Sequence, residues 1–534
     1  MHILFAGGID VKLNKNSIFY HCLLLSSSSV MLQMLGFGYR ILLGRLAGAQ
    51  AIAVYGLVMS AYNVVLSCTL TGVALSVSRI AASYQAIGEG RSIIRLIRTA
   101  LCLFLGLFCL LAIPFGLGRS FFANQILGNP QTEAALLLIV PCLFLTGFEN
   151  VHKAFFYGTG QTLPPTISET LEMLCRIIGA AVLFSLAREK GSLNDGQAAA
   201  LIVCGMIFSE IISASFLTGL YRLRRKKLRG RDSVGMGRIL RDIASVAVPV
   251  SLATLLGRLI SSANMVLIPR VLMRAGSSYE TAMEEFGVLS GMTMPMLMLP
   301  SAFLSPLITV LSPRFSAEHA LDNTAMIRRK TAKALHIVGL IGFPSMALML
   351  SMGKELGLLL YQNEKVGQHL PFLVAITMAG FYYAVLESVL ESIGLQKRCS
   401  VLTVAASLTG LCCTLFLGGV LRLGIHGYLC GELLSALLGG SVCLVWVLRN
   451  TGLSLRLENW IGRPLLASAT AAALMRLVFS RLWNSGVAQP LAVAFSAALF
   501  FLLYTVFLRG LGTDFWTYTQ HTLLRENHRS EPLV

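Results

Sequence analysis

Long apolar runs are the feature that most constrains this chain. Runs of about 18 or more mostly apolar residues match the ~30 Å hydrocarbon layer that a membrane-spanning helix must cross. The 534 residues contain fourteen of them, at 18–43, 51–77, 100–117, 134–157, 166–187, 198–221, 243–272, 286–311, 331–350, 370–393, 401–421, 425–448, 464–482 and 487–508. The sequence therefore predicts an all-α polytopic membrane protein with fourteen transmembrane helices.

The composition supports this class. With 55% hydrophobic and 13% charged residues, the chain has too little polar material to cover a soluble globule of this length. Phosphate-binding loops, His-Glu-x-x-His and Gly-x-Ser-x-Gly motifs are missing from the sequence. The twelve cysteines include no Cys-x-x-Cys pair, which favours packing over metal binding. We therefore expect a transporter rather than an enzyme, with no cofactor and no metal.

The chain contains an internal repeat with an offset of 235 residues. Under this offset the second to fifth apolar runs fall on the eighth to eleventh, and loop residues such as Arg79 and Arg314 coincide. A shift of six crossings preserves the direction of the chain through the membrane, so the halves are predicted to be parallel repeats. Two such six-helix lobes are typical of transporters, which rock about a shared site.

The repeat divides the chain into five segments. We predict an N-terminal lobe of six spans, a basic cytoplasmic linker, a C-terminal lobe of six spans, two added helices and a cytoplasmic tail, at 1–221, 222–242, 243–450, 451–510 and 511–534. The two added helices have no repeat partner. They either pad the bundle or form an apolar groove for the tail of a lipid substrate.

Lysine and arginine are unevenly distributed over the loops. The net charge of +18 could suggest nucleic acid, but in a polytopic membrane protein these residues are placed by insertion. With a cytoplasmic N-terminus, the inner segments, which include Lys153, hold 29 of them and the outer side holds 11. We therefore predict a cell-membrane protein with both termini in the cytoplasm and no nucleic-acid partner. In this interpretation the basic cluster at 222–231 fixes topology.

Arg40, Arg45 and Arg258 are three of the arginines that lie in or beside the spans. A charged side chain at bilayer depth costs about 2.5–3.5 kcal/mol, so it is expected to be paired or functional. Arg258 has no acid three or four residues away in its own span. Guanidinium groups bind phosphate oxygens in bidentate fashion, which makes the three arginines candidates for holding a substrate diphosphate. The alternative for Arg40 and Arg45 is that they anchor a helix end at the lipid headgroups.

A second set of candidates is mainly acidic. Glu169, Glu172 and Arg176 share the fifth span, and Glu387 lies in the tenth. These residues are candidates for a polar cavity lining or for coupling to an ion. Glu172 and Arg176 are four residues apart with the acid first, which equally suits a self-neutralised structural pair. All six aspartates fall outside the spans, so the sequence favours an anionic substrate.

Several segments resemble a known family: Tyr39-Arg-Ile-Leu-Leu-Gly-Arg-Leu-Ala-Gly48, Ser78-Arg79, Phe155-Phe-Tyr-Gly-Thr-Gly-Gln161, Pro164-Pro-Thr and Leu289-Ser-Gly-Met-Thr-Met-Pro295 with Leu299-Pro300. Over about residues 18–450 the chain is similar to the stage V sporulation protein B family. That family lies in the polysaccharide-exporter branch of the multidrug, oligosaccharidyl-lipid and polysaccharide (MOP) exporter superfamily, whose fold is MATE-like.

The resemblance implies two parallel six-helix lobes, often with two further C-terminal helices. It also implies a flippase that moves an undecaprenyl-diphosphate-linked glycan, such as a peptidoglycan precursor for the spore cortex, to the outer leaflet. Arg40 and Arg45 match the first-helix arginines of related lipid II flippases only loosely, because their spacing differs by about one residue. Arg258 is an inference from the sequence alone.

Three hypotheses about function follow. The first is a lipid-linked glycan flippase that works by alternating access, with the lipid bilayer and the glycan lipid as its partners. The second is a cation-coupled multidrug antiporter of the same fold, which would depend on Glu172 or Glu387. The third is a membrane protein that does not transport and instead recruits cell-wall synthases.

Overall fold

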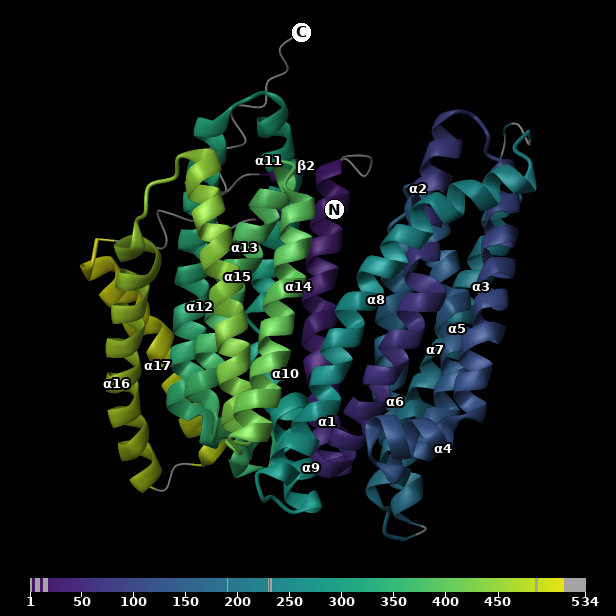
Figure 1. Ribbon diagram of the computed structural model, residues 1–534. Helices are drawn as coiled ribbons and strands as arrows, with labels where there is room; N and C mark the ends of the chain where they lie inside the picture. The colour runs from purple at the N-terminus through teal and green to yellow at the C-terminus, as the bar shows by residue number, and fades with distance from the viewer. Residues whose placement is uncertain are drawn as a thin grey trace. The chain divides into compact units, whose positions relative to one another are not determined.

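A computed structural model describes residues 2–4, 10–12, 18–189, 191–228, 230, 233–485 and 488–512. Arg229, Arg231 and Asp232 of the predicted linker, and residues 513–534 of the predicted tail, lie outside the described residues. The described residues are almost entirely helical (Figure 1). The exceptions are two short antiparallel strands, β1 (His2–Leu4) and β2 (Asp10–Lys12).

The chain divides into two compact units, of which the first comprises residues 1–291 and 414–425. Its helices are α1 (Ile18–Leu66), α2 (Gly72–Ala86), α3 (Ser92–Leu117), α4 (Arg119–Phe121), α5 (Glu133–Gly158), α6 (Leu163–Arg188), α7 (Asp195–Arg225), α8 (Met236–Arg274) and α9 (Tyr279–Gly287). Short 3-10 or π-helical turns are η1 (Ser67–Thr71), η2 (Phe122–Leu127), η3 (Pro130–Thr132), η4 (Val288–Thr293), which runs into the second unit, and η6 (Thr414–Val420).

The second unit comprises residues 292–413 and 426–534. Its helices are α10 (Met294–Leu297), α11 (Ser301–Ala320), α12 (Thr324–Tyr361), α13 (Leu370–Ser392), α14 (Gln396–Cys413), α15 (Ile425–Thr451), α16 (Arg463–Asn484) and α17 (Gln489–Gly510), with turns η5 (Glu364–Gly367) and η7 (Glu458–Gly462). The added pair, α16 and α17, packs against α12 through a core that includes Leu340, Met352 and Phe500. The Tyr504 hydroxyl donates to the carbonyl of Leu340 over 3.0 Å, which fixes α17 on α12.

Twelve helices of the described chain are long and apolar enough to cross a membrane, against fourteen predicted. The first of them, 28–86, has 59 residues and would be nearly three times as long as the hydrocarbon layer is thick. It is broken at Gly48, whose φ of 80° lies in the left-handed region that favours glycine. The predicted run at 286–311 is divided among α9, η4, α10 and α11, where Pro295 and Pro300 interrupt regular helix. These two segments account for the difference, and the count of fourteen stays a prediction.

Small residues let the helices of the first unit approach closely. A Cβ added to Gly147 of α5 would lie 1.9 Å from the ring of Phe104 on α3, so the ring fills the space that glycine leaves. Gly179 of α6 and Gly205 of α7 meet backbone to backbone. α7 begins at a capping box, in which Asn194 and Gln197 exchange hydrogen bonds with each other's backbone N–H. Helices α5 and α6 both pack closely on α7, so the three helices form one bundle (Figure 1).

The helix α8 packs along its length on the first unit. Near its start Asp242 accepts a hydrogen bond from the Tyr84 hydroxyl over 3.0 Å, and in its middle Ser262 donates to the carbonyl of Ser60 over 2.9 Å. Near its end Arg270 donates to the carbonyl of Ile126 over 2.6 Å. The sequence predicted α8 as the start of the second lobe at 243–450. The division by contacts therefore differs from the predicted lobes, whose boundaries stay a prediction.

Candidate functional site: a buried charge network in the first unit

Charged side chains from three neighbouring helices meet inside the first unit. Helix α5 contributes Glu149 and Lys153, four residues apart and therefore on one face. Helix α6 contributes Glu169, Glu172 and Arg176, which lie three and four residues apart on one face. Helix α7 contributes Ser209, Glu210 and Ser213. We call these eight residues, together with Ser168 of α6, the α5–α7 network.

Lys153 is the centre of one half of the network. Its Nζ lies 3.0 Å from the Glu149 carboxylate and 3.6 Å from both Glu169 and Glu172. Lys153 was assigned to an inner segment in the distribution of loop charges, but the structure places it inside α5 with a buried side chain. A buried ammonium requires paired carboxylates because desolvation of an isolated charge is costly.

Arg176 is the centre of the other half. Its guanidinium pairs closely with Glu172 and lies 3.6 Å from Glu210. Its Nε donates to the Ser209 hydroxyl over 3.3 Å. The predicted pair of Glu172 and Arg176 is thus present, but it is one part of a larger network rather than a self-contained surface pair.

Two serines complete the surroundings of Glu149. The Ser168 hydroxyl lies 3.1 Å from the Glu149 carboxylate and 2.6 Å from the Ser213 hydroxyl, and Ser213 also contacts Glu149. Ser168 and Ser213 are fully buried. Glu149 therefore receives hydrogen bonds from α6 and α7 as well as the ion pair on its own helix, which holds the three helices in register.

The carboxylates lie close together. Oxygens of Glu149, Glu172 and Glu210 lie within 4.8 Å of one another, a spacing that a metal ion could bridge. Two ionised carboxylates at that separation repel by about 3–4 kcal/mol at an effective dielectric constant of about 20. Lys153 and Arg176 offset this repulsion, because both form ion pairs with the same carboxylates.

The predicted arginines lie elsewhere in the first unit. Arg40 is on α1 and Arg258 is on α8, and both side chains are exposed, as is that of Arg45. Within the described part of the chain, no hydrogen bond or ion pair is found for Arg40 or Arg258. Arg40 and Arg176 both lie near Tyr39 and Tyr55 of α1, so α1 approaches the α5–α7 network around these residues. The diphosphate role of the three arginines stays a prediction.

Glu387 belongs to the second unit and has different partners. Its carboxylate accepts a hydrogen bond from Thr403 over 2.7 Å and from Tyr383 over 3.4 Å. The Tyr383 and Thr403 hydroxyls lie 2.9 Å apart. No basic residue pairs with Glu387 in the described chain, so it forms a small polar site of its own.

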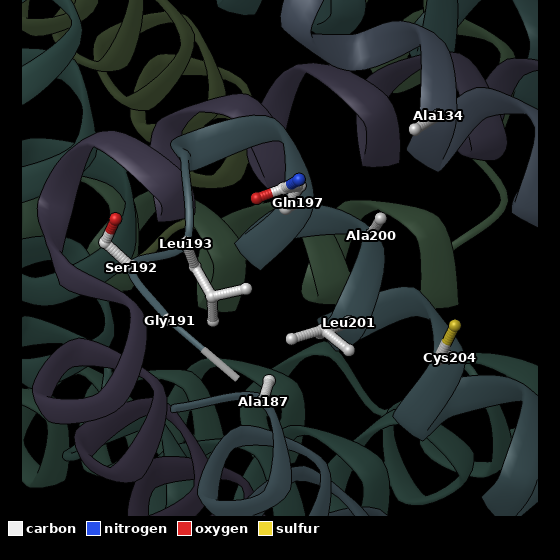
Figure 2. A pocket seen from close by; sticks show the side chains of 9 residues that line it. All are labelled: Ala134, Ala187, Gly191, Ser192, Leu193, Gln197, Ala200, Leu201 and Cys204. Carbon is white, nitrogen blue, oxygen red and sulfur yellow. The ribbon is translucent and has the colours of Figure 1, made fainter. Parts of the chain in front are cut away.

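The first unit also has a cavity of about 430 Å³ where α6 ends and α7 begins (Figure 2). Its lining is mostly small and apolar, and none of the predicted site residues takes part: Ala134, Ala187, Gly191, Ser192, Leu193, Gln197, Ala200, Leu201 and Cys204. This cavity therefore offers space without charged groups, and it does not include the residues of the α5–α7 network.

The sequence missed the central residues of the network. Lys153 was counted as a topology signal, while Glu149 and Glu210 were not among the candidate residues. The i, i+4 spacing of Glu149 and Lys153 was the available signal. The contribution of α7 had no such signal, because convergence of α5, α6 and α7 is a tertiary property.

Residues 21–319 match the model of a protein family described as polysaccharide biosynthesis protein. Because this match covers more than half of the chain, the chain belongs to that family. It is 23% identical over 380 residues to stage V sporulation protein B of Bacillus subtilis (strain 168), covering 70% of this chain and 72% of that protein. The predicted resemblance is thus confirmed.

Solved structures share the fold at low sequence identity. An inward-facing MATE family multidrug resistance transporter of the MOP superfamily matches with a TM-score of 0.66 at 16% identity, over 80% of this chain and 98% of that chain. The lipid II flippase MurJ in an inward closed conformation matches with a TM-score of 0.61 at 12% identity, over 92% and 99%. The protein is a multi-pass membrane protein with a MATE-like fold. Its relatives are transporters and a flippase, in agreement with the prediction of a transporter rather than an enzyme.

Proposed function

We propose that this protein is a flippase that moves an undecaprenyl-diphosphate-linked glycan, such as a peptidoglycan precursor for the spore cortex, across the cytoplasmic membrane by alternating access. Membership of the polysaccharide biosynthesis family and similarity to a sporulation protein support this function. The likeness to the lipid II flippase MurJ supplies a fold suited to it. Both chain termini are cytoplasmic in this proposal.

The observation that carries the choice of substrate is the exposure of Arg40 and Arg258 in membrane-spanning helices without a protein partner in the described chain. Unpaired cations are expensive at bilayer depth, so they are expected to have a ligand there. A diphosphate supplies oxygens for bidentate guanidinium contacts, and Arg45 adds a third cation. In this proposal the glycan travels with the diphosphate and the polyprenyl tail stays in lipid.

The membrane potential could drive such a step. Moving an anion out of a negative interior is favourable by about 2.3 kcal/mol per charge per 100 mV. The net energy also depends on charges that the protein itself moves during the cycle.

The test is genetic. Expression of this chain is expected to restore growth to cells depleted of their essential wall-precursor flippase. Arg258→Gln is expected to lower that rescue, while Arg119→Gln is the matched control because Arg119 forms only an exposed ion pair with Glu133 at 3.3 Å. Failure of the wild-type chain to rescue, despite normal membrane insertion, would count against the flippase. Full rescue by a well-folded Arg258→Ala variant would contradict the role of Arg258 in holding the diphosphate.

A second candidate function has one specific observation in its favour. The α5–α7 network is rich in carboxylates, which a cation-coupled multidrug antiporter would use. For that function, expression should confer drug resistance that depends on a proton or sodium gradient, and Glu172→Gln or Glu387→Gln should abolish it. Unchanged drug sensitivity would exclude it.

A further inference from the structure

Three arginines converge at one end of the first unit. Arg222 and Arg225 lie in the last turn of α7, and Arg98 lies near the start of α3. Arg98 and Arg225 both lie near the ring of Tyr221. Arg222 lies near the ring of His152, whose centroid is 4.9 Å from that of Tyr221. The three arginines, which we call the arginine cluster, therefore gather around one pair of aromatic rings from α5 and α7.

The arginine cluster lacks an acid to balance it. Within the part of the chain that the structure describes, no hydrogen bond or ion pair is found for Arg98, Arg222 or Arg225. Glu149 also lies near this ring pair, but its carboxylate is already paired with Lys153 at 3.0 Å. Like charges gathered around one ring pair repel one another, and an anion among them removes that cost. Two members of the cluster are exposed and the third is half-buried, so an anion can reach them.

Membrane insertion does not require this arrangement. The positive-inside rule depends on how many basic residues flank the spans, and it does not require those of α3 and α7 to meet at one place. Arg224 shows the difference. It lies in the same turn as Arg222 and carries the same charge, but a separation of two residues puts it on the opposite face of α7.

An apolar stripe of α5 leads away from the arginine cluster. Spaced by three or four residues, its members share one face of the helix: Leu137, Pro141, Phe144, Phe148 and His152. Leu137 and Phe144 are 46% and 38% exposed, whereas His152 at the arginine end is 1% exposed. Helix α3 flanks the stripe through Phe108, whose ring centroid lies 5.6 Å from that of Phe144, and α7 flanks it through Tyr221 (Figure 1).

The cluster and the stripe together match a lipid with an anionic headgroup. Phe144 and His152 are eight residues apart, which is about 12 Å along α5 and within the ~15 Å that the acyl chains of one leaflet occupy. An acyl chain on the stripe therefore places its headgroup phosphate at the arginines, which bind phosphate oxygens in bidentate fashion. A soluble phosphate would use the cluster alone, and a zwitterionic lipid would bring an ammonium group into it.

We propose that the arginine cluster and the α5 stripe form a binding site for one anionic phospholipid of the surrounding bilayer. Its phosphate contacts Arg98, Arg222 and Arg225, and one acyl chain lies on the stripe between α3 and α7. The bound lipid bridges α3 and α7 and stabilises their packing on α5. This proposal does not depend on the flippase function.

The first measurement counts the lipids bound to the purified, delipidated protein by native mass spectrometry. The protein is titrated with phosphatidylglycerol and with phosphatidylcholine of the same acyl chains. The wild type is expected to bind one phosphatidylglycerol more tightly than phosphatidylcholine. Arg98→Gln and Arg222→Gln should each weaken this binding about fivefold, as the loss of one basic residue near an anionic headgroup predicts. Arg224→Gln is the matched control, because it removes the same charge from the same turn, and it should leave the affinity unchanged.

Four results of the titrations would overturn the proposal. Equal weakening by Arg224→Gln and Arg222→Gln would indicate a diffuse basic surface, and equal affinity of the wild type for the two lipids would show that the headgroup charge is not recognised. Displacement of the lipid by glycerol 3-phosphate at a comparable concentration would identify a site for soluble phosphates. Tighter binding of a lipid diphosphate in competition would identify a different occupant, the headgroup of the proposed substrate.

The second measurement tests the apolar half of the site. Phosphatidylglycerol with a photoreactive acyl chain is placed in bilayer nanodiscs with the full chain, and the cross-linked peptides are mapped. The expected peptides contain residues 137–148 of α5, and the double variant Arg98→Gln, Arg222→Gln should lose most of this labelling while it keeps the size-exclusion profile of the wild type. Labelling that is spread evenly over the exposed helices, or that is unchanged in the double variant, overturns the proposal.

Discussion

At the scale of single residues, the α5–α7 network depends on charge balance. Lys153 neutralises acids of α5 and α6, and Arg176 neutralises acids of α6 and α7. Removing one member of a buried ion pair is far more harmful than removing an exposed one, because the partner is left as an uncompensated charge. The two predictions that follow use this difference.

Lys153→Met is expected to destabilise the protein by about 3–5 kcal/mol, because it leaves three buried carboxylates with only Arg176. The measurement is thermal or denaturant unfolding in detergent. Lys354→Met is the matched control: Lys354 pairs with Glu364 at 2.9 Å, both side chains are about 60% exposed, and the expected cost is at most about 1 kcal/mol. Equal costs for the two variants would contradict the description of the network as buried and interdependent.

The defect of Lys153→Met is expected to depend on pH. Without the ammonium, the folded protein binds more protons at the crowded carboxyl groups than the unfolded chain does at the same pH. Stability then rises as the pH falls, so the deficit relative to the wild type should shrink from alkaline to mildly acidic conditions. Adding Glu149→Gln should recover part of it at alkaline pH. A deficit that grows on acidification would contradict this assignment.

At the scale of helices, the long apolar runs predicted most elements, but the exact ends of the helices depended on contacts. Glu169, Glu172 and Arg176 share a face of α6 by spacing alone, so their grouping was predictable. The break at Gly48 falls between the predicted runs 18–43 and 51–77, so its place was predictable as well. The contribution of Glu210 was hidden, since nothing in the sequence of α7 shows which face meets α5.

Gly147→Ala is expected to destabilise the contact of α3 with α5, because the new Cβ would lie 1.9 Å from the buried ring of Phe104. Overpacking of this kind typically costs about 1–3 kcal/mol. Gly106→Ala on α3 is the control: nothing lies within 4 Å of its added Cβ, and alanine favours a helix interior by up to about 1 kcal/mol. Unfolding measurements should therefore give changes of opposite sign, and a tolerated Gly147→Ala would contradict the packing.

The start of α8 is fastened to the loop between α2 and α3. The buried carboxylate of Glu89 accepts hydrogen bonds from Ser92 over 2.8 Å and from the backbone N–H of Ser233 over 3.1 Å, and Arg95 donates to the carbonyl of Val234 over 2.6 Å. Glu89→Ala should release this segment and increase hydrogen exchange at residues 233–240. Glu133→Ala is the control, because Glu133 forms only a partly exposed ion pair with Arg119. Unchanged hydrogen exchange in Glu89→Ala would show that the hydrogen bonds of Glu89 do not hold the start of α8 in place.

At the scale of the whole molecule, hydropathy alone was enough to predict an all-α polytopic membrane protein. A membrane-spanning helix must satisfy its backbone internally, so apolar length translates directly into helices. The resemblance to the MOP superfamily could also be recognised from sequence segments. It is confirmed by the family match and by the fold. The lobe boundaries were inferred from the repeat, and the contacts of α8 with the first unit show why a repeat in sequence does not determine which helices pack together.

The most direct test of the central claim measures the initial rate at which purified protein moves a labelled lipid diphosphate across vesicle membranes. The wild type is expected to accelerate translocation over empty vesicles. Combined Arg40→Gln, Arg45→Gln and Arg258→Gln should slow it by about ten- to a hundredfold, as loss of charge-assisted contacts worth about 1.5–3 kcal/mol predicts. Arg119→Gln should leave the rate unchanged. A wild-type rate equal to that of empty vesicles, or a triple variant as fast as the wild type, would contradict the claim.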